Sequence, residues 1–141
     1  IVLTDGAKMI VTPTYHVFDL YKVHQGATYL PAELSTRAYA EGDESIPGIS
    51  ASASRRADGT IHVTLCNLDP MRAADLEIAI SGGAAGKVQG RVLTAPDMTA
   101  HNTFETPDAV QPEAFTGARV AAGGIVATLP PKSVVVLEIR P

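Results

Sequence analysis

The sequence predicts a mainly β protein, an antiparallel β-sandwich of the jelly-roll-like kind, preceded by one α-helix. Three observations lead to this fold class. Apolar and polar residues alternate along two stretches that read as hairpins, 49–68 and 118–130. Turn residues recur about every 8 to 12 positions, as they do in sandwiches. A helical period is present only near the start, over residues 12–26.

The predicted helix has both of its end signals. Thr12 suits the N-cap, and Pro13 suits the first helical position, where its missing N–H would be unpaired in any case. Gly26 supplies the left-handed residue that ends many helices. An aromatic stripe at helical spacing lies between these ends, made of Tyr15, Phe18 and Tyr21. We therefore expect an amphipathic helix that covers an apolar surface.

Residues 1–11 precede the helix and read as the end of a strand followed by a loop. Strand, loop and helix make half of a βαβ unit, and the second strand is missing. The chain also opens without a methionine and already within an apolar run. These features predict that residue 1 is a cut end within a longer polypeptide.

After the helix, residues 28–48 carry two prolines and mixed charge, so we expect a connecting segment with one short strand. The hairpin over 49–68 turns at the letters ADG and directs alternate residues to one face. The residues expected on that face are Ile61, Val63 and Leu65.

Further strands are predicted in the second half of the chain. Residues 75–81 place Leu76, Ile78 and Ile80 on one side, and a strand over 87–95 follows a glycine-rich turn. Residues 96–117 show no period and are expected to form an ordered or functional loop. A second hairpin over 118–130 and a β-branched strand over 130–141, buried on both faces, complete the sandwich.

The overall composition excludes several classes. A chain of 141 residues is the size of one domain, and its net charge of −4 does not suit a nucleic-acid surface. No apolar run is long enough for a membrane span. Cys66 is the only cysteine, so an internal disulfide is impossible.

A search for chemistry finds no active site. None of His16, His24, His62 and His101 has metal-ligand spacing, and His62 and Cys66, four apart in a strand, would lie roughly 13 Å apart. Cys66 has no assignable base and reads as a structural thiol. The acidic stretch around Asp43 reads as a solvated loop; its members are Glu33, Glu41, Asp43 and Glu44.

A carbohydrate-binding module would need an exposed row of aromatic rings. The chain has no Trp, and the rings outside the helix are Tyr29, Tyr39, Phe104 and Phe115. This composition weakens the binding-module reading and leaves it open as an alternative.

Longer stretches of the sequence resemble a known family. Residues 2–26, VLTDGAKMIVTPTYHVFDLYKVHQG, are similar to the end of the barrel in family 51 glycoside hydrolases, the α-L-arabinofuranosidases. Four more stretches carry the same resemblance: SIPGISASASR, IHVTLCNLDP, RVLTAPDMTAHNTFETPDAVQP and LPPKSVVVLEI. The resemblance covers essentially the whole chain.

The resemblance implies a (β/α)8 catalytic barrel followed by this β-sandwich, and retaining hydrolysis of terminal non-reducing α-L-arabinofuranosyl residues from arabinan and arabinoxylan. Two barrel glutamates would act as acid/base and nucleophile, with no metal or other cofactor. No glutamate of this chain matches either motif; they are Glu33, Glu41, Glu44, Glu77, Glu105, Glu113 and Glu138. Thr12 would approach the substrate pocket, because the preceding loop would follow the last barrel strand.

The leading hypothesis therefore divides the chain in two. Residues 1–26 would be the end of the last barrel strand, a loop and the last barrel helix, whose rings rest on barrel strands. Residues 27–141 would be a C-terminal β-sandwich without activity of its own, which supports the barrel in a cytoplasmic homo-oligomer. The alternative is a free-standing carbohydrate-binding or interaction module.

Overall fold

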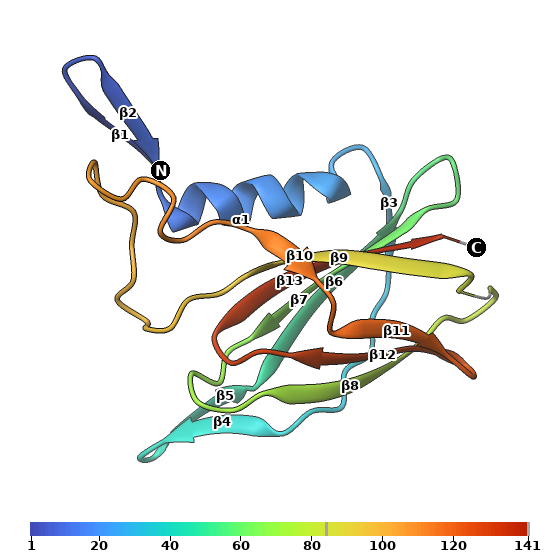
Figure 1. Ribbon diagram of the computed structural model, residues 1–141. Coiled ribbons are helices and arrows are strands. Elements are labelled where there is room, and N and C mark those ends of the chain that lie inside the picture. Colours follow the sequence, from blue (N-terminus) through green and yellow to red (C-terminus); the bar gives the residue numbers. More distant parts are fainter. Residues whose placement is uncertain (84, 141) are drawn as a thin grey trace.

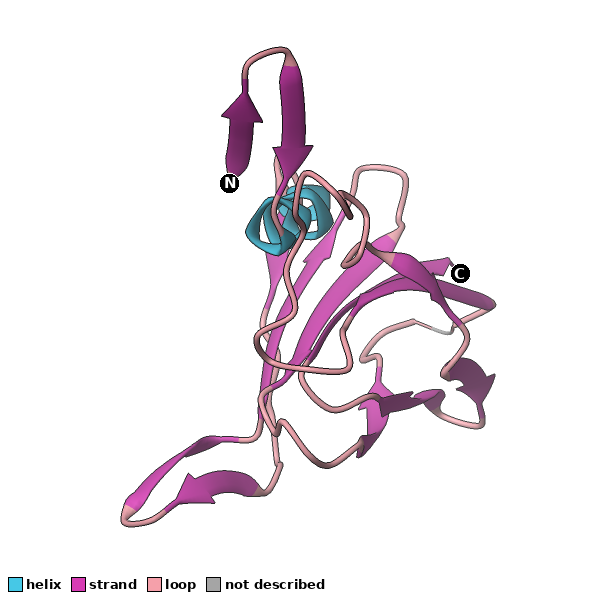
Figure 2. Cartoon of the chain, turned by 60° about the vertical axis from the view of Figure 1, so that its left-hand side comes forward, coloured by secondary structure: helices cyan, strands magenta, loops and turns pink. Residues whose placement is uncertain are grey.

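A helix lies on one face of a six-stranded sheet, and a three-stranded sheet lies on the other face (Figure 1). The computed structural model describes residues 1–83 and 85–140. Two hairpins, β1–β2 and β4–β5, project from opposite ends of the molecule (Figure 2). All strand pairs are antiparallel, as predicted.

The six-stranded sheet has the order β10-β9-β13-β7-β6-β3, and the three-stranded sheet has the order β11-β12-β8. The bounds are β1 Val2–Asp5, β2 Lys8–Val11, α1 Pro13–Tyr21, the 3-10 turn η1 Lys22–His24, β3 Thr28–Leu30, β4 Ala38–Glu41, β5 Glu44–Pro47, β6 Ile49–Arg55, β7 Ile61–Asn67, β8 Ala74–Ala79, β9 Lys87–Leu93, β10 Glu113–Phe115, β11 Ala118–Ala121, β12 Gly124–Leu129 and β13 Ser133–Arg140.

The main core lies between the two sheets and is formed by alternate residues of each strand. Val63 and Leu65 of β7 are buried there, and Leu76 and Ile78 of β8 pack against them from the opposite sheet. These residues share faces because side chains alternate along a strand, so the predicted period-two patterns are confirmed. The fully buried members of this core are Ile125, Leu129, Val135, Leu137 and Ile139.

A second, smaller core lies on the other face of the six-stranded sheet, beneath the helix. Leu20 of α1 is buried against Leu93 of β9 and Val136 of β13, together with Val110 from the long loop. Strand β13 therefore contributes to both cores: Val135 faces one and Val136 the other. This confirms the prediction of a C-terminal strand buried on both faces.

The helix begins and ends near the predicted residues. Thr12 is the N-cap, Pro13 opens the helix, and a 3-10 turn continues it to His24. Gly26 has a φ of 69°, as a residue after a helix end often does. The Thr12 side chain, however, makes no capping bond to the helix.

Residues 1–11 correct one expectation. The predicted strand and loop are a β-hairpin, in which Val2 pairs with Val11 and Asp5 with Lys8. The turn is possible because Gly6 has a φ of 56°, which suits the first position of a two-residue hairpin turn. The dipeptide Asp5–Gly6 was the sequence signal for this hairpin turn.

Two further segments are more ordered than expected. Residues 28–48 contain three short strands instead of one, because β4 and β5 form a hairpin across Gly42, with a φ of 58°. The described residues accordingly contain more strands than the sequence patterns predict. The segment 96–117 forms an ordered loop that ends in β10, which confirms the prediction of an ordered loop.

Candidate functional site

Thr12 lies where the projecting hairpin joins the helix, and its polar groups are already occupied. Its backbone N–H donates to the carbonyl oxygen of Ile1 at 2.9 Å, and its hydroxyl donates to the same oxygen at 3.0 Å. Thr12 therefore closes the base of the β1–β2 hairpin onto the start of α1. Its hydroxyl oxygen keeps lone pairs that can accept a further hydrogen bond.

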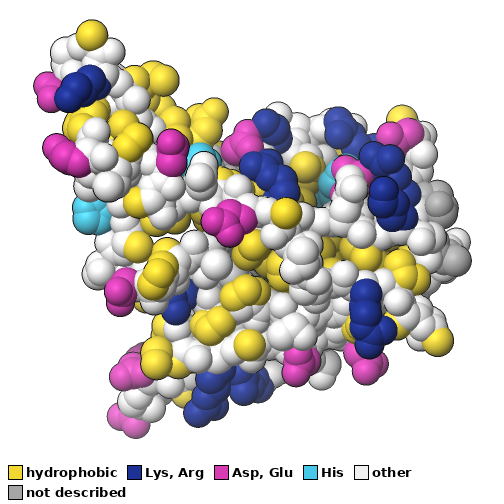
Figure 3. Space-filling view, in the orientation of Figure 1, with side chains coloured by type: hydrophobic (Ala, Val, Ile, Leu, Met, Phe, Trp, Pro, Cys, Tyr) yellow, Lys and Arg dark blue, Asp and Glu magenta, His cyan; other side chains and the backbone are white. Residues whose placement is uncertain are grey.

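The most prominent functional surface is apolar and open to solvent. Six residues of the β1–β2 hairpin and α1 form this outer apolar surface: Ile1, Val2, Leu3, Met9, Tyr15 and Phe18. Met9 is 67% exposed and Phe18 is 63% exposed. Figure 3 shows hydrophobic side chains gathered along the projecting hairpin. Groups of exposed apolar side chains of this kind make these two elements the candidate interaction surface.

The opposite side of the helix packs on the sandwich. Leu20 is only 1% exposed, and Val17 and Val23 pack beside it on the second core. Tyr21 was expected in the outward-facing stripe with Tyr15 and Phe18, and the structure corrects this. The helix turns about 100° per residue, which carries Tyr21 to the flank, where its hydroxyl lies 3.3 Å from the Sγ of Cys66.

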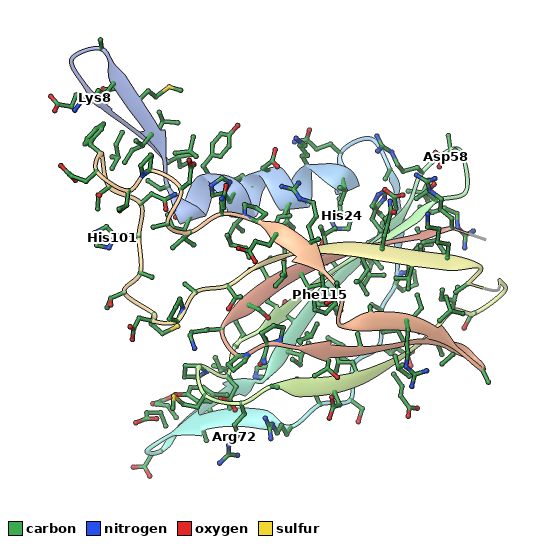
Figure 4. The ribbon with its side chains drawn as sticks, viewed as in Figure 1. Lys8, His24, Asp58, Arg72, His101 and Phe115 are labelled. Carbon is green, nitrogen blue, oxygen red and sulfur yellow. The ribbon has the colours of Figure 1, made fainter. Side chains whose placement is uncertain are left out.

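A polar layer lies beneath the C-terminal end of the helix. His24, labelled in Figure 4, lies between η1 and the sheet. Its Nδ1 is 2.6 Å from the Oγ of Ser54, and its Nε2 is 2.5 Å from the Oγ1 of Thr64. A neutral imidazole donates through one nitrogen and accepts through the other, so one of the two hydroxyls donates to His24. Both ring nitrogens of His24 are thereby satisfied.

His62 extends this polar layer toward the next strand. It is buried in β7, with its Nε2 3.7 Å from the Oε2 of Glu138 and its Nδ1 without a hydrogen-bond partner among the described residues. Burial lowers the pKa of His62, and the nearby Glu138 carboxylate opposes that change. The pKa of His24 is also lowered, by burial first and by the charge of His62 second. Both side chains are therefore held in the neutral form.

The long loop is attached to the helix end of the molecule by Asn102. This buried amide donates from Nδ2 to the carbonyl oxygens of Val11 (2.9 Å) and Val110 (3.0 Å). Its Oδ1 accepts the Val110 N–H at 2.7 Å. Asn102 therefore joins the loop to the base of the β1–β2 hairpin and supports the outer apolar surface.

The structure offers no cluster for metal chemistry in residues 1–83 and 85–140, since no group of three His, Cys, Asp or Glu side chains is close enough to hold an ion. The acidic residues Glu41, Asp43 and Glu44 lie exposed at the tip of the β4–β5 hairpin, and Glu33 is exposed before it. Cys66 is half-buried against Tyr21. His16 lies on α1 with its Nε2 buried, and His101 bonds the Thr99 carbonyl oxygen in the long loop.

The four aromatic residues considered for a sugar platform lie on four separate segments. Tyr29 is on β3, Tyr39 on β4, Phe104 in the long loop and Phe115 on β10. Tyr29 is 75% exposed, whereas the other three are partly covered. Phe115 packs on the main core. The arrangement does not produce the row of rings that stacking on a polysaccharide needs.

Sequence reasoning missed three polar residues that position this end of the molecule: Asn102, Ser54 and Thr64. Asn102 lies in a stretch without a period, and nothing in its neighbours distinguishes it from a solvated loop residue. Ser54 and Thr64 fall on the polar positions of alternating strands, which suggests a solvent-facing side. The helix was the available signal. Because a helix must pack on one face of a sheet, some strand residues that look solvent-facing had to lie beneath it.

Comparison with known proteins gives a family for the whole chain. The sequence model of the family described as the alpha-L-arabinofuranosidase C-terminal domain matches residues 1–133. A Bacteroides ovatus protein named intracellular exo-alpha-L-arabinofuranosidase is 41% identical over 140 residues, which is 99% of this chain and 27% of that protein.

Solved structures agree with the family match. The family 51 arabinofuranosidase of Xanthomonas axonopodis pv. citri superposes with a TM-score of 0.95 at 43% identity, over 99% of this chain and 28% of that one. The thermostable family 51 enzyme of Thermotoga petrophila superposes with a TM-score of 0.83 at 25% identity, over 99% and 31%. The chain thus spans less than a third of the length of each of these relatives.

Proposed function

The chain belongs to the α-L-arabinofuranosidase C-terminal domain family, and we propose that it is the structural C-terminal part of an arabinofuranosidase with a separate catalytic barrel. The longer enzyme would release terminal non-reducing α-L-arabinofuranosyl residues from arabinan or arabinoxylan, with retention of configuration. The two catalytic glutamates would lie in the barrel, and none in this chain.

The outer apolar surface is the observation that carries this proposal. A helix needs one face to pack on the sandwich, and α1 uses Leu20 for that purpose. The opposite side still carries Phe18, beside a hairpin whose apolar residues are largely exposed. Exposed apolar side chains on both elements fit a surface that a further domain covers, and the catalytic barrel is the occupant we propose.

The proposed boundary lies at the helix end. Residues 1–26, with the β1–β2 hairpin and α1, would complete the barrel, and residues 27–141 would form the sandwich. The helix would then serve both parts: Leu20 anchors it to the sandwich, and Tyr15 and Phe18 face the barrel. Thr12, at the start of the helix, would lie on the substrate side of the barrel.

The family assignment also bears on location and assembly. The Bacteroides ovatus relative is named an intracellular enzyme, and no helix in the described residues is both long and apolar enough to cross a membrane. We propose that the longer enzyme works in the cytoplasm and forms a homo-oligomer.

The test compares the 141-residue chain with the longer protein on an aryl α-L-arabinofuranoside. We expect turnover by the longer protein and none by the chain alone. Arabino-oligosaccharides are then titrated into the chain and followed by tyrosine fluorescence. No saturable change is expected; saturable binding would instead support the carbohydrate-binding alternative, and turnover by the chain alone would overturn the proposal.

A further inference from the structure

The β4–β5 hairpin projects from the sandwich as an arm. Strands β4 and β5 pair with each other, and neither belongs to the two larger sheets. Nine of the ten residues from 38 to 47 are exposed, and only Tyr39 is partly covered. A lone two-stranded hairpin is marginally stable in water, so the arm would gain stability from a contact with another molecule.

The charges of the arm are separated along its length. Its tip carries three carboxylates within four residues: Glu41, Asp43 and Glu44. Its base carries Arg37 and, from the adjacent turn, Arg72. Figure 3 shows acidic side chains at the lower left end of the molecule with basic side chains next to them. The arm is therefore negative at one end and positive at the other.

The two arginines at the base differ in how much they are already paired. The Arg37 guanidinium donates to the Asp69 carboxylate at 3.5 Å and to the Ala73 carbonyl oxygen at 3.3 Å. The Arg72 side chain, labelled in Figure 4, makes no hydrogen bond or ion pair with any described residue. Arg72 is thus the cation that can bind a partner.

The position of the arm indicates which partner this is. The β1–β2 hairpin and α1, which carry the outer apolar surface assigned above to the barrel, lie in the upper part of Figures 1 and 2, and the arm lies at the bottom in both views. The arm consequently points away from the elements that we propose face the barrel. A second copy of the chain supplies a matching arm, in which the acidic tip of one can lie on the basic base of the other.

Resting on the proposed function, we propose that the arm is a subunit contact of the longer enzyme, where two arms lie antiparallel about a two-fold axis. Each tip then meets the partner arm's base, because each strand of four residues spans about 14 Å and the charges lie at its two ends. Tyr39 and Ile46, which pair across the arm, supply the apolar part of the contact.

A charge-swap experiment in the longer enzyme tests this contact. Glu41→Lys with Glu44→Lys makes both ends of the arm basic, and Arg72→Glu in the same protein restores opposite ends. We expect sedimentation equilibrium to show the dissociation constant rising about tenfold or more in the double variant. The triple variant should return to within about threefold of the parent value.

The matched control reverses two exposed carboxylates outside the arm, Glu77→Lys with Glu113→Lys, and should leave the dissociation constant unchanged. An unchanged constant in the arm double variant, or a parent that is monomeric, overturns the inference. So does a triple variant that fails to recover. Turnover of the aryl arabinofuranoside is measured in every variant, so a failure of the contact and a failure of the proposed activity are read separately.

Discussion

The Nε2 of His24 lies 2.5 Å from the hydroxyl oxygen of Thr64, which is fully buried in β7. The contact joins the end of the helical segment to the centre of the six-stranded sheet. The other ring nitrogen of His24 is hydrogen-bonded to the Ser54 hydroxyl. A protonated imidazole donates from both nitrogens, so the hydroxyl that now donates to His24 would have to rotate before the ring could take up a second proton. The attachment of the helix therefore depends on a neutral imidazole.

This geometry predicts that stability falls below about pH 6.5. The pKa values of His24 and His62 are lowered in the folded chain, chiefly by burial, so the unfolded chain binds more protons in that range. The free energy of unfolding should then rise with pH, by at most about 1.4 kcal/mol per pH unit for each histidine. The slope should be lost near neutral pH, where both forms are already deprotonated.

Thermal unfolding between pH 5 and pH 8 measures this effect, and His24→Gln is the matched variant. Glutamine keeps a donor and an acceptor but does not titrate, so the melting temperature should depend less on pH. The carboxylates Asp19 and Asp69 have lowered pKa values, through bonds from Lys22 and from the Met71 N–H respectively. These two carboxylates titrate at lower pH, so they do not contribute to the change in stability between pH 5 and pH 8. An equal slope in the His24→Gln variant would refute the assignment.

Leu20→Ala should destabilise the chain more than any other change on the helix. Leu20 is 1% exposed and is the helix residue buried in the second core. Truncation leaves a cavity, and we expect a loss of about 2–5 kcal/mol in unfolding free energy. Denaturant titration followed by circular dichroism measures the loss. Leu20→Met, which keeps the volume, should cost less than about 1.5 kcal/mol.

The fold class was predictable because it depends on periods that the strands display. Ile61, Val63 and Leu65 alternate with polar residues, and one buried face follows from that alternation alone. The unbroken apolar run over residues 134–137 of β13 likewise indicated burial on both faces. These signals are local, so a single sequence contains them.

The polar attachments were not predictable because they join residues far apart in the chain. His24 is 40 positions from Thr64, and Asn102 is 91 positions from Val11. Neither pair shares a local pattern, and each contact depends on the order of the strands in the sheet. The predicted direction of Tyr21 was wrong for a related reason. Aromatic rings lie on both flanks of the helix, and the position of the sheet beneath determines which of these rings is covered.

Phe18→Ala should have different effects on stability in the isolated chain and in the longer enzyme. Phe18 is 63% exposed in the chain described here, so its truncation should change the stability of the isolated chain by no more than about 0.5 kcal/mol. If the barrel covers this ring, the same change should cost the longer enzyme about 3–5 kcal/mol. Chemical denaturation of both proteins gives the two values. Equal, small effects in both would count against a barrel on the outer apolar surface.

Asn102→Asp should release the long loop although the two side chains have nearly the same shape. The carboxylate retains the acceptor for the Val110 N–H but loses both donors, and it faces the carbonyl oxygens of Val11 and Val110. Each buried group left unsatisfied costs about 1–3 kcal/mol. We expect faster amide exchange at Val110 and faster proteolysis within residues 96–112. Thr99→Ala, a change at an exposed residue of the same loop whose side chain makes no hydrogen bond with the described residues, serves as the control.

Gly124→Ala should disrupt the hairpin between β11 and β12, whereas Gly123→Ala next to it should be tolerated. Both glycines have positive φ, 94° at Gly123 and 151° at Gly124, so an alanine is strained at either site. They differ in surroundings, because a Cβ at Gly123 would meet no atom within 4 Å and one at Gly124 would overlap the carbonyl oxygen of Ile78 on β8. That oxygen belongs to a paired backbone and cannot move aside.

The expected loss in unfolding free energy is about 1 kcal/mol for Gly123→Ala and about 3 kcal/mol or more for Gly124→Ala. Denaturant titration of the two single variants gives the difference directly, because the backbone cost is common to both and the steric cost falls on Gly124 alone. Equal losses would mean that β8 and β12 are not in the register in which Gly124 faces Ala79. The pairing of β8 with β12 at the edge of the main core would then be wrong.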